Sequence, residues 1–161
     1  MPTTSYAIAL GSNRPGRHGP PERELAAALA ALGHVVAHVV AVSPILRTAP
    51  LGPSIRRYAN AVALIETGEE PPALLRRLKA IERDFGRRNG RRWGARVLDL
   101  DIVLWSGGPW SSPGLTIPHA AFRERGFVLD PLAGVAPDWR DPITGLSVRQ
   151  LRARQLRRRV P

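Results

Sequence analysis

The residues best suited to chemistry are two aspartates, Asp99 and Asp101, within the apolar segment 97–104 (VLDLDIVL). On a β-strand alternate side chains share a face, so these carboxylates would point the same way, about 7 Å apart along the strand. The opposite face would carry Leu98, Leu100, Ile102 and Leu104 into a core. Paired carboxylates among positive charge favour a hard cation, above all Mg²⁺ carrying phosphates. The alternative is that the two aspartates lie on a solvated face of the strand and pair with arginines.

An arginine- and glycine-rich segment, 86–96 (GRRNGRRWGAR), precedes this strand. Arginine offers a planar fork of donors for phosphate oxygens, and glycines let a loop fold over a ligand. An alternative interpretation is an RNA-binding loop in which bases stack on Trp93. RNA binding, however, leaves the paired aspartates without a role.

Two further residues, Tyr58 and Asn60, fall on one face of a second strand. A ring beside an amide can stack on a flat heterocycle and hydrogen-bond its edge, although a strand tyrosine can equally belong to the core. His119 has two interpretations: it donates a hydrogen bond to phosphate, or it is an ordinary surface histidine. Glu82 lies within the apolar arc of its helix and needs a partner, from a ligand site or from an arginine.

Composition narrows the classes of function. The chain has 161 residues and no cysteine, which fits one domain and excludes disulfide scaffolds, thiol nucleophiles and thiolate metal sites. Of 24 lysine and arginine residues only Lys79 is lysine, so no P-loop Gly-Lys-Ser/Thr sequence exists. The net charge of +11 indicates anionic partners: nucleic acid, phosphorylated small molecules or an acidic membrane surface. With neither a signal-peptide pattern nor an apolar run long enough to cross a bilayer, we expect a cytoplasmic protein without membrane contact.

The elements that must position these residues follow from hydrophobic periodicity and turn signals. We expect strands over 5–10, 34–42 (resuming at 45–48), 58–66 and 98–105, and helices over 22–32 and 71–85, with a turn-rich loop over 106–114. His34 and His38 would then be same-face strand residues, which we take as structural. Ser147 and Gln150 form a capping box that opens a last helix. The β-α-β-β-α-β order predicts a single α+β domain, 1–161, with a ferredoxin-like antiparallel sheet, helices on one face and C-terminal tail elements.

Several motifs together resemble one family. They are ALGSN (9–13), RTAPLGP (47–53), YANA (58–61), RWGAR (92–96) running into LDLDI (98–102), PH (118–119) and RGFVL (125–129). The combination R-W-G-x-R-x-L-D-L-D-I is highly specific. The chain therefore resembles the 6-hydroxymethyl-7,8-dihydropterin pyrophosphokinases of folate biosynthesis, which have a ferredoxin-like α+β fold.

The resemblance implies transfer of pyrophosphate from ATP, the co-substrate, to the hydroxymethyl group of the dihydropterin, with release of AMP. It implies two Mg²⁺ ions on Asp99 and Asp101, and action of Arg87 and Arg96 on the phosphates. Positions matching the pterin pocket are Thr48, Leu51, Tyr58, Asn60, Trp93 and Phe127. Positions matching the ATP side are Glu82, Arg87, Trp93, Arg96, Ile102, Thr116, His119 and Arg125.

The chain departs from the family pattern at Ala49, Ile55, Gly114 and Ala120, which bears on the shape of the substrate pockets but not on the aspartates or catalytic arginines. We expect a monomer without a nucleic acid partner. Two alternatives stay open: an arginine-rich RNA-binding module, and a pterin-binding paralogue that transfers nothing.

Overall fold

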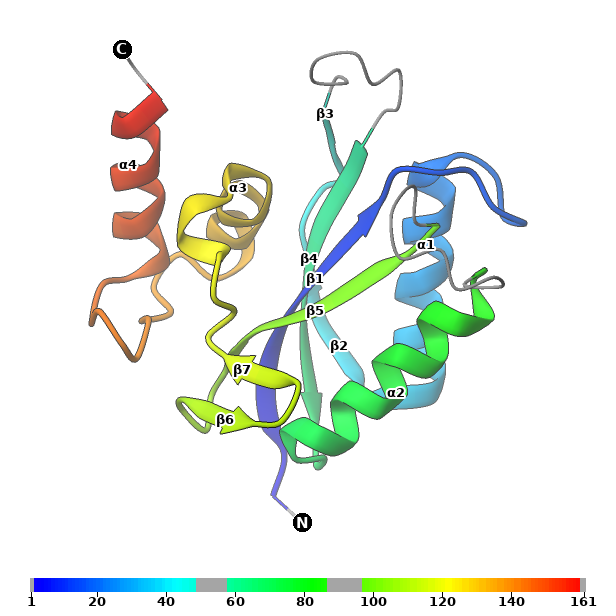
Figure 1. Ribbon diagram of the computed structural model, residues 1–161, viewed down its shortest axis with the longest axis horizontal. Helices are drawn as coiled ribbons and strands as arrows, with labels where there is room; N and C mark the ends of the chain where they lie inside the picture. Colours follow the sequence, from blue (N-terminus) through cyan, green and yellow to red (C-terminus); the bar gives the residue numbers. More distant parts are fainter. Residues whose placement is uncertain (1, 49–57, 87–96, 160–161) are drawn as a thin grey trace.

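The computed structural model describes residues 2–48, 58–86 and 97–159, and a five-stranded antiparallel sheet lies at its centre (Figure 1). The inner strands are β1 (Thr4–Ser12) and β4 (Tyr58–Thr67). Beside β1 lies β5 (Asp99–Trp105), while β2 (His38–Val42) and β3 (Leu46–Thr48) both pair with β4. The order β2-β4-β1-β5, with a helix in each crossover, confirms the predicted ferredoxin-like α+β core.

Two helices, α1 (Pro21–Ala31) and α2 (Pro71–Asp84), cover one face of this sheet. Both begin with proline, whose missing N–H costs nothing in the first helical turn. The side chains buried between these helices and the sheet include Tyr6, Ile8, Leu10, Leu25, Leu74 and Leu78. This layer is the helical face that the sequence predicts.

The predicted strand over 34–42 is wrong at its beginning. Helix α1 continues into a π-helical turn, η1 (Leu32–Val36), closed by a 3.0 Å hydrogen bond from the Ala37 N–H to the Leu32 carbonyl. This i→i−5 bond carries the chain past Gly33 before β2 can start at His38. His34 therefore belongs to the turn and does not share a strand face with His38.

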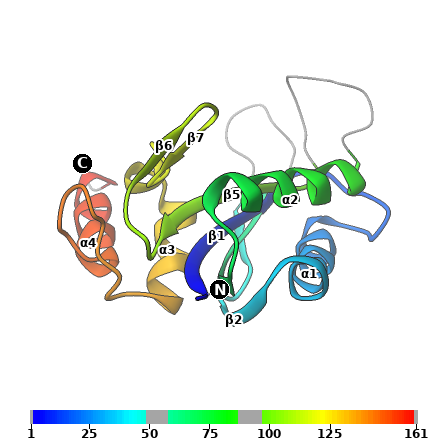
Figure 2. The same ribbon diagram turned by 90° about the horizontal axis from the view of Figure 1, so that it is seen from below.

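The tail elements cover the other face of the sheet (Figure 2), as α3 (Gly126–Val135) packs on β4 and α4 (Val148–Arg159) packs on α3. Their buried side chains join a second cluster that includes Ala7, Val62, Leu129, Leu132, Val148 and Leu151. The predicted capping box of α4 is confirmed: the Ser147 N–H donates to Gln150 Oε1 at 2.9 Å, and the Gln150 N–H donates to Ser147 Oγ at 3.2 Å.

Strand β5 holds a bulge that corrects one detail of the predicted alternation. Ile8 pairs with Ile102 but Ala7 pairs with Leu104, so Val103 is the extra residue. Leu98, Leu100 and Ile102 face the α1–α2 layer as predicted, whereas Leu104 joins the cluster beneath α3. Asp99 and Asp101, before the bulge, keep the face opposite Leu100.

The segment after β5 contains a hairpin in place of the predicted loop. Its strands are β6 (Trp110–Ser112) and β7 (Leu115–Ile117), with Gly114 at φ +77° in the turn. A short 3₁₀ helix, η2 (Phe122–Glu124), then leads into α3. Among the described residues, no helix is long and apolar enough to span a membrane.

Candidate active site

A pocket opens on the α3 side of the sheet, where β4, β1 and β5 meet the first turn of α3. Its lining residues are Ala9, Leu10, Gly11, Asn60, Ala61, Asp99, Asp101, Arg125, Phe127 and Val128. Five of them are residues singled out in the sequence, and they come from three segments far apart along the chain. The fold therefore gathers the two aspartates, the amide, the arginine and one aromatic ring into a single hollow.

Register across the sheet explains how the floor of this pocket forms. Gly11 of β1 lies directly opposite Asn60 of β4 on one side and Asp99 of β5 on the other. Residues that pair directly in antiparallel strands point to the same face, so Asn60 and Asp99 flank a position without a side chain. A Cβ atom at Gly11 would lie 3.2 Å from Asn60 Oδ1 and would crowd the floor. Gly11 belongs to the ALGSN motif, but its role in the pocket was not predicted from the sequence.

The electrostatics of the aspartate pair favour a cation. Burial raises the pKa of Asp101, the nearby Asp99 carboxylate raises it further, and the charges of His119, Lys79 and Arg125 work against this rise. Negative charge is thus costly here unless a positive ligand compensates it. Within the described residues no group of three histidine, aspartate or glutamate side chains gathers around a metal position. A hard cation on this pair would take its remaining oxygen ligands from phosphates and water.

The entrance to α3 supplies both a positive charge and an aromatic face. Arg125 is the N-cap residue of α3, and its guanidinium carbon lies 5.6 Å from the centroid of the Phe127 ring. Phe127 is 41% exposed and Tyr58 is 37% exposed, so both residues are accessible to a stacking partner. Tyr58 begins β4, two residues before Asn60 and on the same face of that strand.

His119 is held by backbone bonds close to the aspartates. Its N–H donates to the Val103 carbonyl at 3.0 Å, and its Nδ1 accepts from the Ala121 N–H at 3.2 Å. Because Nδ1 is an acceptor, the neutral ring carries its proton on Nε2. This arrangement leaves Nε2 as the donor for an anionic ligand.

Three other predicted ATP-side residues lie apart from the lining of the pocket. Glu82 is buried beneath β5, where its Oε2 accepts from the Leu100 N–H at 2.7 Å and its Oε1 lies 3.1 Å from Lys79 Nζ. The partners that Glu82 needs include a lysine and a strand amide, and the carboxylate ties α2 to β5. Ile102 is buried in the α1–α2 layer, and Thr116 is exposed on β7.

Several predicted residues fall outside the described ranges. They are Ala49, Leu51, Ile55, Arg87, Trp93 and Arg96. Thr48 is the last described residue before the first gap, and its backbone pairs with that of Tyr58. Gly86 and Val97 bound the second gap.

Comparisons with known proteins match this chain to one family. The family model for 7,8-dihydro-6-hydroxymethylpterin-pyrophosphokinase matches residues 7–137. A curated 2-amino-4-hydroxy-6-hydroxymethyldihydropteridine pyrophosphokinase of Pseudomonas aeruginosa is 43% identical over 137 residues, covering 84% of this chain and 82% of the relative. The protein of the same name from Haemophilus influenzae is 44% identical over the same shares of both chains.

Among solved structures, wild-type HPPK-DHPS of Plasmodium falciparum superimposes with a TM-score of 0.78 over 98% of this chain at 13% identity. This chain spans 42% of that structure's length. At such low identity the likeness concerns the fold alone, and it agrees with the sheet order and helix layers described above.

Proposed function

This chain belongs to the 7,8-dihydro-6-hydroxymethylpterin-pyrophosphokinase family, and we propose that it transfers pyrophosphate from ATP to 6-hydroxymethyl-7,8-dihydropterin, releasing AMP, in folate biosynthesis. The observation that carries the proposal is the single pocket shared by Asp99, Asp101, Asn60, Arg125 and Phe127. It combines a cation-binding pair with an aromatic and amide surface for a flat heterocycle. An RNA-binding module would need neither.

On the phosphate side, Asp99 and Asp101 would hold two Mg²⁺ ions. Bound Mg²⁺ neutralises phosphate charge and orients the triphosphate. Arg125 and His119 lie close enough to Asp101 to lower its pKa, and both side chains would donate to phosphate oxygens beside it. Glu82 serves this side by fixing the Leu100 amide between the two aspartates. Thr116 would border the nucleotide from β7, whereas Ile102 would do so only through its backbone, because its side chain is buried in the α1–α2 layer.

On the pterin side, Tyr58 and Phe127 would stack on the two faces of the ring while Asn60 bonds its polar edge. An amide suits this role because it both donates and accepts. Gly11 leaves the space between Asn60 and Asp99 open, so the hydroxymethyl group can approach the phosphates there. Thr48, Leu51 and Trp93 would complete the pocket.

The chemistry requires the hydroxymethyl oxygen to attack the β-phosphorus in line, with AMP as the leaving group. Arg87 and Arg96 would stabilise the charge that develops during this transfer. We propose that the chain acts as a cytoplasmic monomer without nucleic acid. Its lack of cysteine fits a reducing compartment, and its positive charge fits a polyphosphate substrate.

The proposal is tested by product analysis. With ATP, Mg²⁺ and the hydroxymethyl dihydropterin, the protein should release AMP, and omission of the pterin or the metal should stop release. ADP as the product, or AMP release without pterin, would refute the proposed reaction.

A second arm separates the enzyme from the RNA-binding alternative. Arg87→Ala and Arg96→Ala should lower kcat by about a hundredfold to a thousandfold while changing ATP affinity far less. Arg154→Ala, an exposed change on α4, is the matched control and should leave kcat unchanged. Unchanged kcat in both loop variants, with weaker and less salt-sensitive RNA binding, would favour the RNA-binding module.

A further inference from the structure

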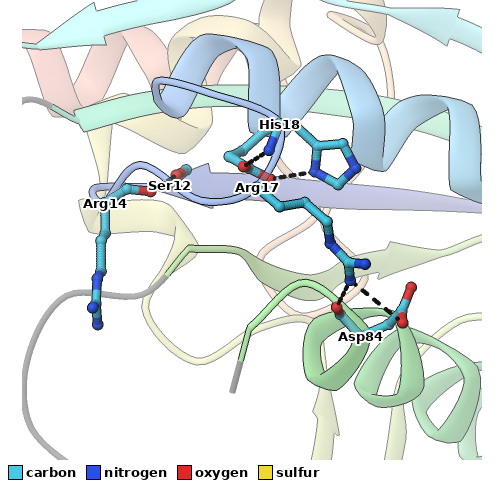
Figure 3. A network of polar contacts seen from close by, with 6 residues as sticks. Ser12, Arg14, Arg17, His18 and Asp84 are labelled. Atoms are coloured by element: carbon cyan, nitrogen blue, oxygen red, sulfur yellow. Dashed lines mark hydrogen bonds and ion pairs between the residues drawn. The ribbon is translucent and has the colours of Figure 1, made fainter. Parts of the chain in front are cut away.

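A buried carboxylate that the proposed chemistry does not use holds the segment between β1 and α1. Glu24 of α1 is fully buried, and its Oε1 accepts from the His18 backbone N–H at 2.8 Å. Its Oε2 lies 2.8 Å from His18 Nδ1 (Figure 3). Gly16 and Gly19 exchange backbone hydrogen bonds of 3.0 and 3.1 Å, which close the loop that presents His18.

The same segment also contacts the end of α2. The His18 ring lies 4.8 Å from the Phe85 ring, centroid to centroid, with an angle of 32° between their planes. The Arg17 guanidinium donates to the Asp84 carbonyl and lies 3.5 Å from Asp84 Oδ1, as Figure 3 shows. Phe85 is the C-cap of α2, so these contacts fix the last residues of that helix.

A third set of contacts reaches the chain just before β5. A Cβ atom on Gly16 would lie 2.6 Å from Val97 Cγ1 and 2.6 Å from Glu24 Oε1, so Gly16 is packed tightly between them. A Cβ atom on Gly86 would lie 3.3 Å from Val97 Cγ2. Gly86 and Val97 therefore lie together, beside the group formed by Gly16, His18 and Glu24.

We propose that His18 and Glu24 are a positioning pair for pyrophosphate transfer, an inference that rests on the proposed function. In the chain Arg87 follows Gly86 and Arg96 precedes Val97, so the pair fixes the two points from which the catalytic arginines extend. Neither His18 nor Glu24 lines the pocket; they act through Phe85, Gly86 and Val97. Misplacement of a catalytic group by about 1 Å can cost on the order of a hundredfold in rate, so this support governs turnover and not substrate affinity.

Three variants at His18 separate the side-chain hydrogen bond to Glu24 from the ring contact with Phe85. All three keep Glu24 and the hydrogen bond that it accepts from the residue 18 backbone N–H. His18→Asn keeps a donor near the Nδ1 position, His18→Phe keeps a ring against Phe85, and His18→Ala removes both. His18→Ala should lower kcat by about tenfold to a hundredfold, with both KM values within about twofold of wild type. The Asn and Phe variants should each recover part of the loss.

Hydrogen exchange supplies a readout that needs no turnover. The Phe85 and Gly86 N–H groups bond to the Ile81 carbonyl at 3.0 Å and the Arg83 carbonyl at 3.2 Å. Their exchange should accelerate in His18→Ala while the amides of β1 and β4 keep wild-type rates. Arg149→Ala breaks an exposed ion pair with Asp138 on the far side of the sheet and should change neither kcat nor exchange.

The kinetic and hydrogen-exchange results together decide whether His18 has the positioning role. Slower turnover with faster exchange confined to the end of α2 supports the positioning role. Wild-type kcat, a raised KM with unchanged kcat, slower turnover with unchanged exchange, or acceleration at every amide would each overturn it. If the wild-type protein releases no AMP, the proposed function fails, and the exchange result still decides whether His18 holds the end of α2.

Discussion

Two carboxylates on the α3 side of the molecule, those of Asp141 and Asp101, have contrasting electrostatic surroundings. Asp141, before α4, accepts from Arg123 Nε at 2.5 Å and Nη2 at 2.9 Å, from the Ile143 N–H at 3.0 Å and from Thr144 Oγ1 at 2.8 Å. Burial alone would raise the pKa of Asp141, but the bonds from Arg123, Ile143 and Thr144 outweigh it and lower the pKa to about 2. Asp101 is partly buried beside another carboxylate, and its pKa is raised.

The difference indicates that Asp141 has a structural role and supports the proposal that Asp101 binds a cation. Asp141 has its charge neutralised by an arginine within the fold, so it ties η2 to the segment before α4. Asp101 shares a pocket with Asp99, and the positive charges near it only partly offset burial and repulsion. A cation bound with phosphates would supply the remaining compensation.

The largest predicted effect is on enzyme activity, which should fall in variants of Asp99 and Asp101 but not in a variant of Asp141. Asp99→Asn and Asp101→Asn should each lower Mg²⁺-dependent AMP release by at least about a hundredfold, because each removes a charge that we propose holds the metal and phosphates in place. Steady-state assays at saturating ATP and pterin measure the loss. Asp141→Asn is the matched control and should retain kcat at temperatures where it stays folded. Equal kcat in all three variants would contradict the assignment of a functional role to Asp99 and Asp101 and a structural role to Asp141.

The next effect concerns the two aromatic residues that we propose stack on the pterin. Tyr58→Ala and Phe127→Ala should each weaken pterin binding by about 1–3 kcal/mol, roughly a fivefold to 150-fold rise in Kd, because each removes one proposed stacking face. Calorimetric titration with pterin and with an ATP analogue measures both affinities. A loss of ATP affinity with pterin affinity intact would mean that the two substrates are assigned to the wrong sides.

A pH-dependent stabilisation of the fold should appear at Asp141. Its folded pKa, about 2, lies below an unfolded value near 4, so the folded state favours the charged form. The resulting stabilisation of about 2 kcal/mol is fully present above pH ~4 and is lost as pH falls through about 2. Urea unfolding of the wild type and of Asp141→Asn should show a gap in unfolding free energy that narrows over this window. A gap independent of pH would show that Asp141 is not held as a low-pKa carboxylate.

The smallest effect has the opposite sign and concerns Asp101. Because its folded pKa is raised, its charged form costs stability above that pKa, and the cost disappears as pH falls below the unfolded value. Asp101→Asn should therefore raise the Tm of the metal-free protein at neutral pH while lowering activity. Thermal unfolding in excess chelator measures this change. A lower Tm for Asp101→Asn would indicate that the fold compensates this charge without a ligand.

One side of this contrast, the aspartate pair on β5, was predictable from the sequence because a local pattern determined it, whereas Asp141 was not singled out. Alternation placed Asp99 and Asp101 on one face, and the capping box at Ser147 marked the start of α4. Helix α3 was missed because it is apolar nearly all round and contains Pro131, so it has neither a polar stripe nor an uninterrupted helical pattern. It is covered by the sheet on one side and by α4 on the other, which is a property of the tertiary structure.

Other features depended on partners far away in the chain. The bulge at Val103 depends on register with β1, and the π-helical turn at Leu32 competes with a valine-rich strand signal that local propensity favours. The role of Gly11 depends on Asn60 and Asp99 lying on either side of it. The contact between His18 and Glu24 spans only six residues, but its link to Phe85 appears only once α2 is in place.

The most direct test of the central claim is metal binding itself. Mn²⁺, used in place of Mg²⁺, can be titrated by electron paramagnetic resonance in the presence of α,β-methylene ATP, which cannot release AMP. We predict two Mn²⁺ ions per wild-type chain, the same number in Asp141→Asn, and loss of bound Mn²⁺ in Asp99→Asn and Asp101→Asn. Wild-type binding in both of the latter variants would contradict the assignment of this aspartate pair as the metal site.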